Sequence, residues 1–186
     1  MSIFNFFKKK KVEEPTYDPT NLSVFDLEKG FIFEYNMKNW EVAEVYEYDW
    51  GNNFITREYK IDSGDEVLYL SVEDDDEVIL SVMRKIKARA IDENLPETII
   101  KNERPPQKLE FEGKIYLLDE ELPGYFQNIE EDPDNWSEFI SWDYEDQTEK
   151  FILCVEQWGE RSFEAAVGFY IEQHEIRDIT PGKTNV

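Results

Sequence analysis

Polar and apolar residues alternate along most of the chain after Phe25, with the period of two that β-strands require. Val, Ile, Tyr, Phe and Trp, which favour strands, occupy the apolar positions. Turn-forming residues separate the alternating segments, as in NMKN (36–39), DWGNN (49–53) and DSGDE (62–66). In the first half of the chain, the pattern therefore predicts strands at 31–35, 40–48, 54–61, 66–73 and 77–83.

The second half of the chain repeats this plan. KLEFEGKIYLLDEE (108–121) predicts two strands that meet at Gly113. The same alternation predicts further strands at 139–146, 149–158, 162–171 and 174–179.

Two segments join these halves. RKIKARAI (84–91) continues the alternation, which predicts a strand with Lys85, Lys87 and Arg89 on one face, paired with acidic residues next door. The proline-marked stretch 92–108 predicts a connector with a short helical turn around residues 97–101.

The two halves also resemble each other in detail, which indicates an internal duplication. WGNNFITREY (50–59) aligns with WSEFISWDY (136–144), and LYLSVE (68–73) aligns with FILCVE (151–156). Alternation then places every second residue in a core and the remainder on the opposite face. The predicted core residues are Leu68, Leu70, Val72, Phe151, Leu153 and Val155. The opposite face carries Tyr69, Ser71, Glu73, Ile152, Cys154 and Glu156.

We therefore predict an all-β protein in which two related β-meander or barrel-like halves pack as one body. The expected division is a basic and aromatic N-terminal tail and linker (1–24), a first β half (25–91), a connector (92–108), a second β half (109–180) and a C-terminal tail (181–186). The N-terminal tail is expected to be flexible.

The net charge of the chain limits the kinds of partner that we expect. The 186 residues carry a net charge of −23, so the chain repels phosphate backbones and no nucleic-acid partner is expected. The single cysteine forms no intramolecular disulfide, and no apolar run reaches the length of a transmembrane helix. These features predict a cytoplasmic protein.

The sequence resembles the bacterial domain-of-unknown-function family 4178. The segments that carry the resemblance are KGFIFEYNMKNWEVAEVYEYDW, REYKIDSGDEVLYLSVEDDDE, LEFEGKIYLLDE and FISWDYEDQTEKFILCVEQWGERSFEAAVGFYI. The resemblance implies a compact β domain with no assigned catalytic activity, in a setting alongside membrane-stress proteins. It supplies no catalytic residues.

The residues that could carry chemistry are few. Cys154 is expected in mid-strand with a raised pKa, and His174, the only histidine, is expected in a polar turn. The acidic runs EDDDE (73–77) and EEDPD (130–134) lack the spacing of an EF-hand loop, and no glycine-rich phosphate loop occurs. We predict no catalytic residues, no metal site and no cofactor.

Four residues are candidates for ligand contact. Trp142 and Trp158 could line a binding groove between the halves, although strand aromatics more often belong to a core. Glu73 and Glu156 end matched strands, and two such carboxylates could also serve a glycoside hydrolase.

The N-terminal residues Ile3, Phe4, Phe6, Phe7, Lys8, Lys9, Lys10 and Lys11 form a segment that could bind anionic lipid weakly, dock into a protein partner or remain a frayed end. The favoured function is a non-enzymatic interaction or scaffold protein, acting in the bacterial cytoplasm and near the inner membrane surface. The alternative is a small-ligand or carbohydrate-binding β domain, followed by a hydrolase. The identity of the partner and the oligomeric state stay open.

Overall fold

The computed structural model describes residues 21–74, 77–132 and 135–182. Short helices accompany the strands: the 3₁₀ helices η1 (Val24–Asp26) and η2 (Gln173–Glu175), and the α-helices α1 (Ala88–Ile91) and α2 (Leu95–Asn102). The strands are β1 (Ile32–Tyr35), β2 (Lys38–Asp49), β3 (Ile55–Asp62), β4 (Val67–Asp74), β5 (Val78–Ile86), β6 (Lys108–Phe111), β7 (Lys114–Asn128), β8 (Ser137–Asp146), β9 (Phe151–Gly159), β10 (Ser162–Ile171) and β11 (Arg177–Thr180).

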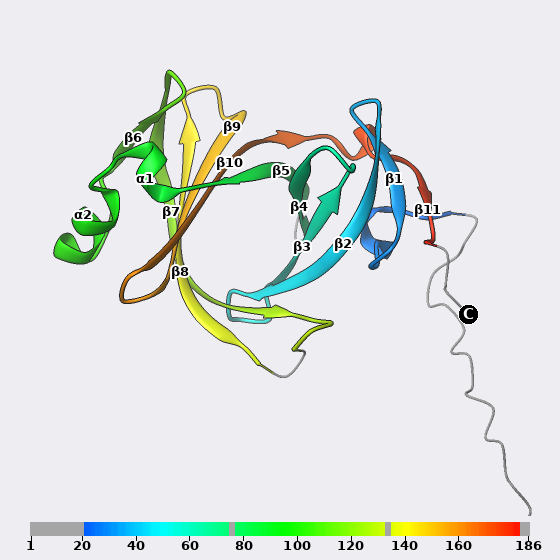
Figure 1. The fold of residues 1–186 in the computed structure, drawn as a ribbon, viewed down its shortest axis with the longest axis horizontal. Coiled ribbons are helices and arrows are strands. Elements are labelled where there is room, and N and C mark those ends of the chain that lie inside the picture. Colours follow the sequence, from blue (N-terminus) through cyan, green and yellow to red (C-terminus); the bar gives the residue numbers. More distant parts are fainter. Residues whose placement is uncertain (1–20, 75–76, 133–134, 183–186) are drawn as a thin grey trace, which may run out of the picture.

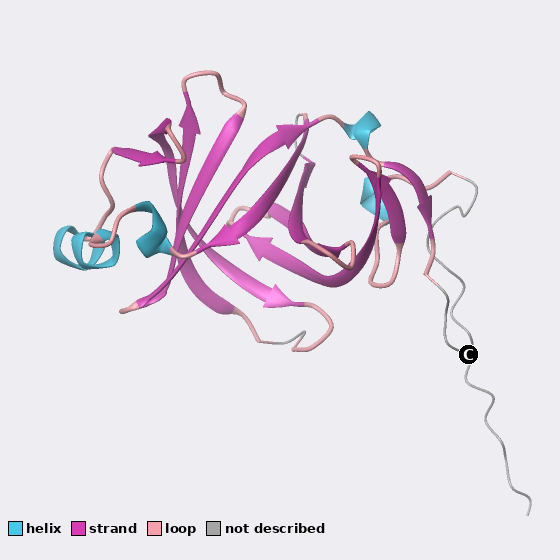
Figure 2. Cartoon of the chain, turned by 45° about the horizontal axis from the view of Figure 1, so that its top comes forward, coloured by secondary structure: helices cyan, strands magenta, loops and turns pink. Residues whose placement is uncertain are grey.

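These strands form one antiparallel sheet, in the order β11-β1-β2-β3-β4-β5-β10-β9-β8-β7-β6 (Figures 1 and 2). An additional pairing between β2 and β7 closes the sheet into a ring of eight strands, from β2 through β5 and β10 to β7. The ring is not a regular barrel. The predicted all-β fold is confirmed.

The two halves have the same strand plan. Each begins with a four-residue strand, β1 or β6, followed by a long strand, β2 or β7, and three more antiparallel strands. Equivalent strands meet where the halves join, because β2 pairs with β7 and β5 pairs with β10. An approximate two-fold relation between the halves follows, as expected from a duplication.

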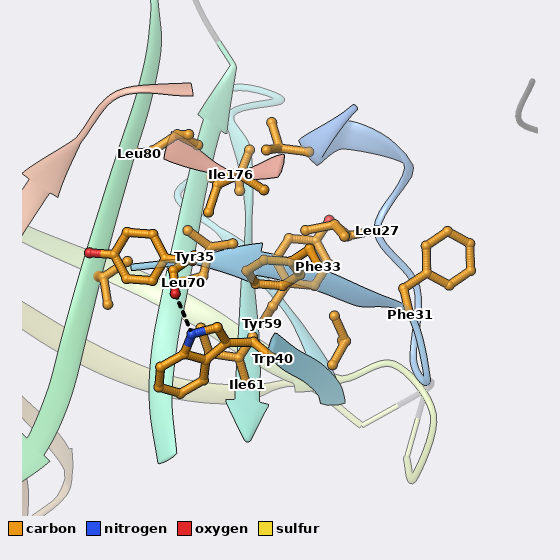
Figure 3. Packing of buried hydrophobic residues seen from close by; sticks show 14 of the residues in the cluster. Leu27, Phe31, Phe33, Tyr35, Trp40, Tyr59, Ile61, Leu70, Leu80 and Ile176 are labelled. Atoms are coloured by element: carbon orange, nitrogen blue, oxygen red, sulfur yellow. Dashed lines mark hydrogen bonds between the residues drawn. The ribbon is translucent and has the colours of Figure 1, made fainter. Parts of the chain in front are cut away.

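The first core lies under β1–β5 and is covered by η1, β11 and the segment after η2 (Figure 3). Phe33, Trp40 and Tyr59 are its large fully buried side chains. The indole N–H of Trp40 donates to the Tyr35 carbonyl at 3.0 Å, so the buried donor is satisfied.

The second core lies under β6–β10 and is covered by α1 and α2, which supply Ala88, Leu95 and Ile99. Figure 1 shows these helices beside β6, at the end of the molecule away from β1 and β11. Helix α2 spans the turn predicted around residues 97–101 and begins with a proline in its first turn, where proline costs no hydrogen bond.

The predicted strand at 84–91 is wrong in its second part. Strand β5 ends at Ile86, where its pairing with β10 ends, and Ala88–Ile91 forms helix α1. Ala and Arg are strong helix formers, and Ala88 gains burial in the second core. Arg89 consequently pairs with Glu97 of α2 rather than with a neighbouring strand.

Candidate functional site

The ring strands enclose a cavity of about 660 Å³ on the face turned away from the two cores. Its walls come from all eight ring strands and from the turn between β2 and β3. This volume lies within the range of small-molecule sites, about 300–1,000 Å³.

Strand alternation explains why the same strands build a core and a cavity. Leu153 and Val155 of β9 are 0% exposed in the second core, whereas Cys154 and Glu156 line the cavity. Strand β4 repeats this arrangement, with Leu70 and Val72 in the first core and Ser71 and Glu73 on the cavity side. The predicted assignment of faces is confirmed for these strands.

The cavity wall is strongly acidic. Seven Asp or Glu residues line it, and within the described part of the chain no Lys, Arg or His does. Its acidic residues are Glu58, Glu73, Asp119, Glu120, Asp143, Glu145 and Glu156. A concave acidic surface concentrates the field of its charges and attracts cations.

Three of these carboxyls are held by neutral donors. Tyr48 donates to Glu58 Oε1 at 3.1 Å, and the indole N–H of Trp158 donates to Glu156 Oε2 at 3.1 Å. The hydroxyl of Ser141 donates to Asp143 Oδ1 at 3.0 Å.

The pKa values of the same carboxyls are raised because burial disfavours their charged form. Burial, together with the nearby charge of Glu58, raises the pKa of Glu156 to about 8. The pKa values of Glu58 and Asp143 are also raised, chiefly by burial. Carboxyls with raised pKa values in a cleft are characteristic of functional sites.

The two lysines on this side of the ring already have acidic partners. Lys85 Nζ lies 2.6 Å from Glu164 Oε2 and 4.9 Å from the centre of the Tyr69 ring. Lys60 pairs with Glu44. Among the ion pairs of the described residues, none involves Glu58, Asp143 or Glu156.

Cys154 contributes a thiol to the wall. Its Sγ lies 3.2 Å from the Ser141 hydroxyl, and burial raises its pKa well above the ordinary value, as predicted. His174 lies in η2 and is not among the residues that line the cavity. The structure therefore does not bring the thiol and the imidazole together as a nucleophile and its base.

Aromatic side chains close the end of the cavity where β2 meets β7. Tyr48 stacks on Trp50 with ring centres 5.7 Å apart, and Phe139 stacks on Trp158 at 4.7 Å. Gly124 permits this packing, because a Cβ there would lie 2.9 Å from Phe139 and 3.0 Å from Trp50. Tyr48 and Trp50 are among the residues that line the cavity.

The structure separates the four predicted ligand candidates. Glu73 and Glu156 both line the cavity, and Trp158 contacts Glu156. Trp142 lies on the opposite face of β8, 0% exposed in the second core, so we leave it out of the site. The N-terminal segment Ile3–Lys11 lies outside the described residues.

The cavity residues that sequence reasoning missed include Glu58, Asp143 and Ser81. The first two occupy matched places in FITREY and FISWDY, so the duplication could have identified them. Ser81 gave no such signal, because it lies between the core residues Leu80 and Val82.

No group of three or more His, Cys, Asp or Glu side chains in the described part of the chain is arranged to hold a metal ion. Across the same residues, no helix has the length and apolar character needed to cross a membrane.

The fold and the cavity define a class: a β protein built from two like halves around a shared acidic cavity. The chain belongs to the family described as "Domain of unknown function (DUF4178)", whose profile matches residues 28–173. The predicted resemblance is thereby confirmed. An "Uncharacterized protein" of Aquifex aeolicus (strain VF5) is 30% identical over 158 residues, which cover 83% of each chain. No solved structure matches.

Proposed function

We propose that this protein is a non-catalytic binding protein that takes up a small polar ligand in the cavity between its halves. The observation that carries the proposal is the cavity itself, about 660 Å³ in volume and walled by the second face of the core-forming strands. The presence of Tyr48 and Trp50 in the wall supports it, because aromatic rings with a few polar groups are typical of ligand sites.

A hydrolase is the competing interpretation, because Glu73 and Glu156 line the same cavity. Incubation with a panel of aryl glycosides distinguishes the two functions. We expect no release of the aryl alcohol above that of the buffer. Turnover that Glu156→Gln abolishes would establish the hydrolase instead.

Access to Cys154 provides the direct test of the cavity. As the only cysteine of the chain and part of the cavity wall, it reports whether small molecules enter the native protein. We expect methyl methanethiosulfonate, a small neutral reagent, to modify native protein at an alkaline pH where the buried thiol ionises, and a maleimide on a long polymer to react only after unfolding. A thiol that resists the small reagent in native protein would overturn the proposal.

A blocking variant then connects the cavity with binding. Ser71→Phe places a ring inside the cavity, whereas Ser137→Phe makes the same change at an exposed position of β8. Thermal shift is measured against a panel of sugars, amines and carboxylates. We expect at least one compound class to stabilise the wild type and Ser137→Phe but not Ser71→Phe, with circular dichroism verifying the fold of each variant.

Partner contact through the N-terminal segment is a separate proposal. Ile3, Phe4, Phe6 and Phe7 precede four lysines, a composition that suits weak binding to anionic lipid. Flotation with anionic vesicles compares the full chain with a version lacking residues 1–11. We expect only the full chain to float, and equal failure of both would remove the membrane contact.

A further inference from the structure

The inner carboxyls of the cavity accept hydrogen bonds from neutral groups, and among the described residues none of them forms an ion pair, although Lys85 acts on Glu58 and Glu156 from a greater distance. Glu58, Asp143 and Glu156 accept hydrogen bonds from a phenol, an alcohol and an indole. The two lysines on this side of the ring are engaged by Glu44 and Glu164. Burial disfavours the charged form of these carboxyls, and a ligand that places a positive charge beside them stabilises that form.

The negative charges come in matched pairs from the two halves. Glu58 of β3 corresponds to Asp143 of β8, and Glu73 of β4 corresponds to Glu156 of β9, in the two aligned segments of the duplication. All four line the cavity. Because equivalent strands of the halves pair with each other, each half presents its acids to the same enclosed space. A ligand that carries more than one positive charge fits this distribution.

Two hydroxyls of the wall form no hydrogen bond with another residue in the described part of the chain, which is an observation independent of the charges. Ser71 and Ser81 are directly opposed on β4 and β5, and both line the cavity. Ser81 is only 7% exposed, and its side chain makes no hydrogen bond within the described structure. The Ser81 oxygen is not among the buried polar atoms that lack a partner, so it is open to the cavity, where it can accept a hydrogen bond from an ammonium group.

The register of the sheet places these hydroxyls beside a carboxyl. Glu58 is the direct neighbour of Ser71 across β3 and β4, and Ser71 is the neighbour of Ser81. The row therefore offers a carboxylate and two hydroxyls to one cationic group. Tyr48 and Trp50 line the same cavity and add aromatic surface to its wall.

We propose that the ligand of this cavity is a linear organic cation with two or more amino groups, one held by the acids of each half. This inference rests on the proposed binding function and names the ligand class. Glu58 and Asp143 are the residues assigned to the two ends.

Four-carbon probes of different charge test the inference. Isothermal titration calorimetry at physiological ionic strength compares 1,4-diaminobutane, 1-aminobutane, 1,4-butanediol and butanedioate on the full chain. We expect one-to-one binding of the diamine, about tenfold tighter than the monoamine, and no binding of the diol or the diacid. Binding of the diol or the diacid as tight as that of the diamine would overturn the proposal.

A metal ion is the second arm of the experiment. Magnesium chloride alone is titrated under the same conditions, and we expect it to bind more weakly than the diamine. Tighter binding of Mg²⁺ than of the diamine would overturn the proposal in favour of a metal site.

Two charge-removing variants locate the site. Glu58→Gln and Asp143→Asn keep the size of the side chain, and we expect each to weaken diamine binding by about tenfold. Glu110→Gln on the edge strand β6 removes the same charge far from the cavity wall and is expected to leave affinity within about twofold. Equal loss in all three variants, or binding of several equivalents, would indicate general counterion attraction and overturn the proposal.

Charged thiol reagents separate this inference from the proposed function. The cationic aminoethyl methanethiosulfonate is expected to modify Cys154 about tenfold faster than the anionic sulfonatoethyl reagent. If the neutral methyl reagent reacts but charge makes no difference, the cavity remains and the cationic ligand is refuted. If no reagent reacts with native protein, the proposed function itself fails.

Discussion

The two faces of the ring strands differ in almost every physical respect. On β9, Leu153 and Val155 are fully buried among aliphatic and aromatic side chains, whereas Cys154 and Glu156 face the acidic cavity. The core face stabilises the fold through apolar burial. The cavity face keeps carboxyls from water and thereby costs free energy. Surfaces that lower the stability of a fold are typical of functional sites. Within a single strand, we therefore assign the core face to stability and the cavity face to ligand binding.

The halves differ less in the cavity than at their outer surfaces. The first core is covered by η1, β11 and the segment after η2, whereas the second is covered by α1 and α2. The matched acids nevertheless line one cavity. The feature that the two halves share is therefore the cavity face of their strands, which we assign to ligand binding.

The largest expected effect is on the core face. Leu153→Ala removes a 0%-exposed side chain from the second core and should lower the free energy of unfolding by about 2–5 kcal/mol. Cys154→Ala, one residue along the same strand, should cost less than about 1 kcal/mol, because its thiol faces the cavity. Urea unfolding measures both. Equal losses would contradict the division of the strand into two faces.

The joint between the halves should show the next largest effect. A Cβ on Gly168 of β10 would lie 2.0 Å from the Val82 carbonyl oxygen of β5. Gly168→Ala should therefore force the two strands apart, at a cost of about 1–3 kcal/mol. Gly159→Ala is the control, because nothing lies within 4 Å of its Cβ. Thermal unfolding should distinguish the variants, and an unchanged Gly168→Ala would refute close contact at this joint.

The acidic face should make stability depend on pH. The pKa of Glu156 rises from 4.5 to about 8 on folding, so the folded protein keeps a proton that the unfolded chain releases. Stability should fall as the pH rises between these values, by at most about 1.4 kcal/mol per unit. Glu58, Asp143, Lys85 and Glu164 act on the same group and share the titration. Urea unfolding across this range should give a flatter profile for Glu156→Gln, and an identical slope would exclude Glu156 as the source.

Sequence reasoning recovered most of the strands because polar and apolar residues alternate along them. Leu70 and Leu153 were assigned to cores from period two alone, and both are fully buried. The same pattern misassigned Ala88–Ile91, because four residues of alternating polarity suit either a strand end or a helical turn, and only contact with the second core decides. Local pattern therefore determined the faces but not every element boundary.

Sequence reasoning identified some of the cavity residues but not the cavity itself. Glu73 and Glu156 were identified as a matched pair, but the closure of the ring through β2 and β7 joins residues about 80 positions apart and has no local signal. Without that closure, Glu58 and Asp143 look like solvated strand acids. From the sequence, Trp142 and Trp158 were equally good candidates for ligand contact. Only the sheet register places Trp142 in the second core.

The smallest expected change in stability concerns two hydroxyls of the cavity wall, those of Thr56 and Ser81. Thr56 Oγ1 accepts the indole N–H of Trp50 at 2.9 Å, whereas Ser81 has no side-chain partner within the described structure. Thr56→Val keeps the shape but removes the acceptor, and should cost about 1 kcal/mol. Ser81→Ala removes a hydroxyl that stabilises nothing in the empty protein and should change the free energy of unfolding by less than about 0.5 kcal/mol. In the presence of 1,4-diaminobutane, however, Ser81→Ala should lose part of the ligand-induced thermal shift, because the hydroxyl is assigned to the bound ammonium group. A large loss of stability in the ligand-free Ser81→Ala protein would show that Ser81 belongs with the structural face of the strand rather than with the ligand.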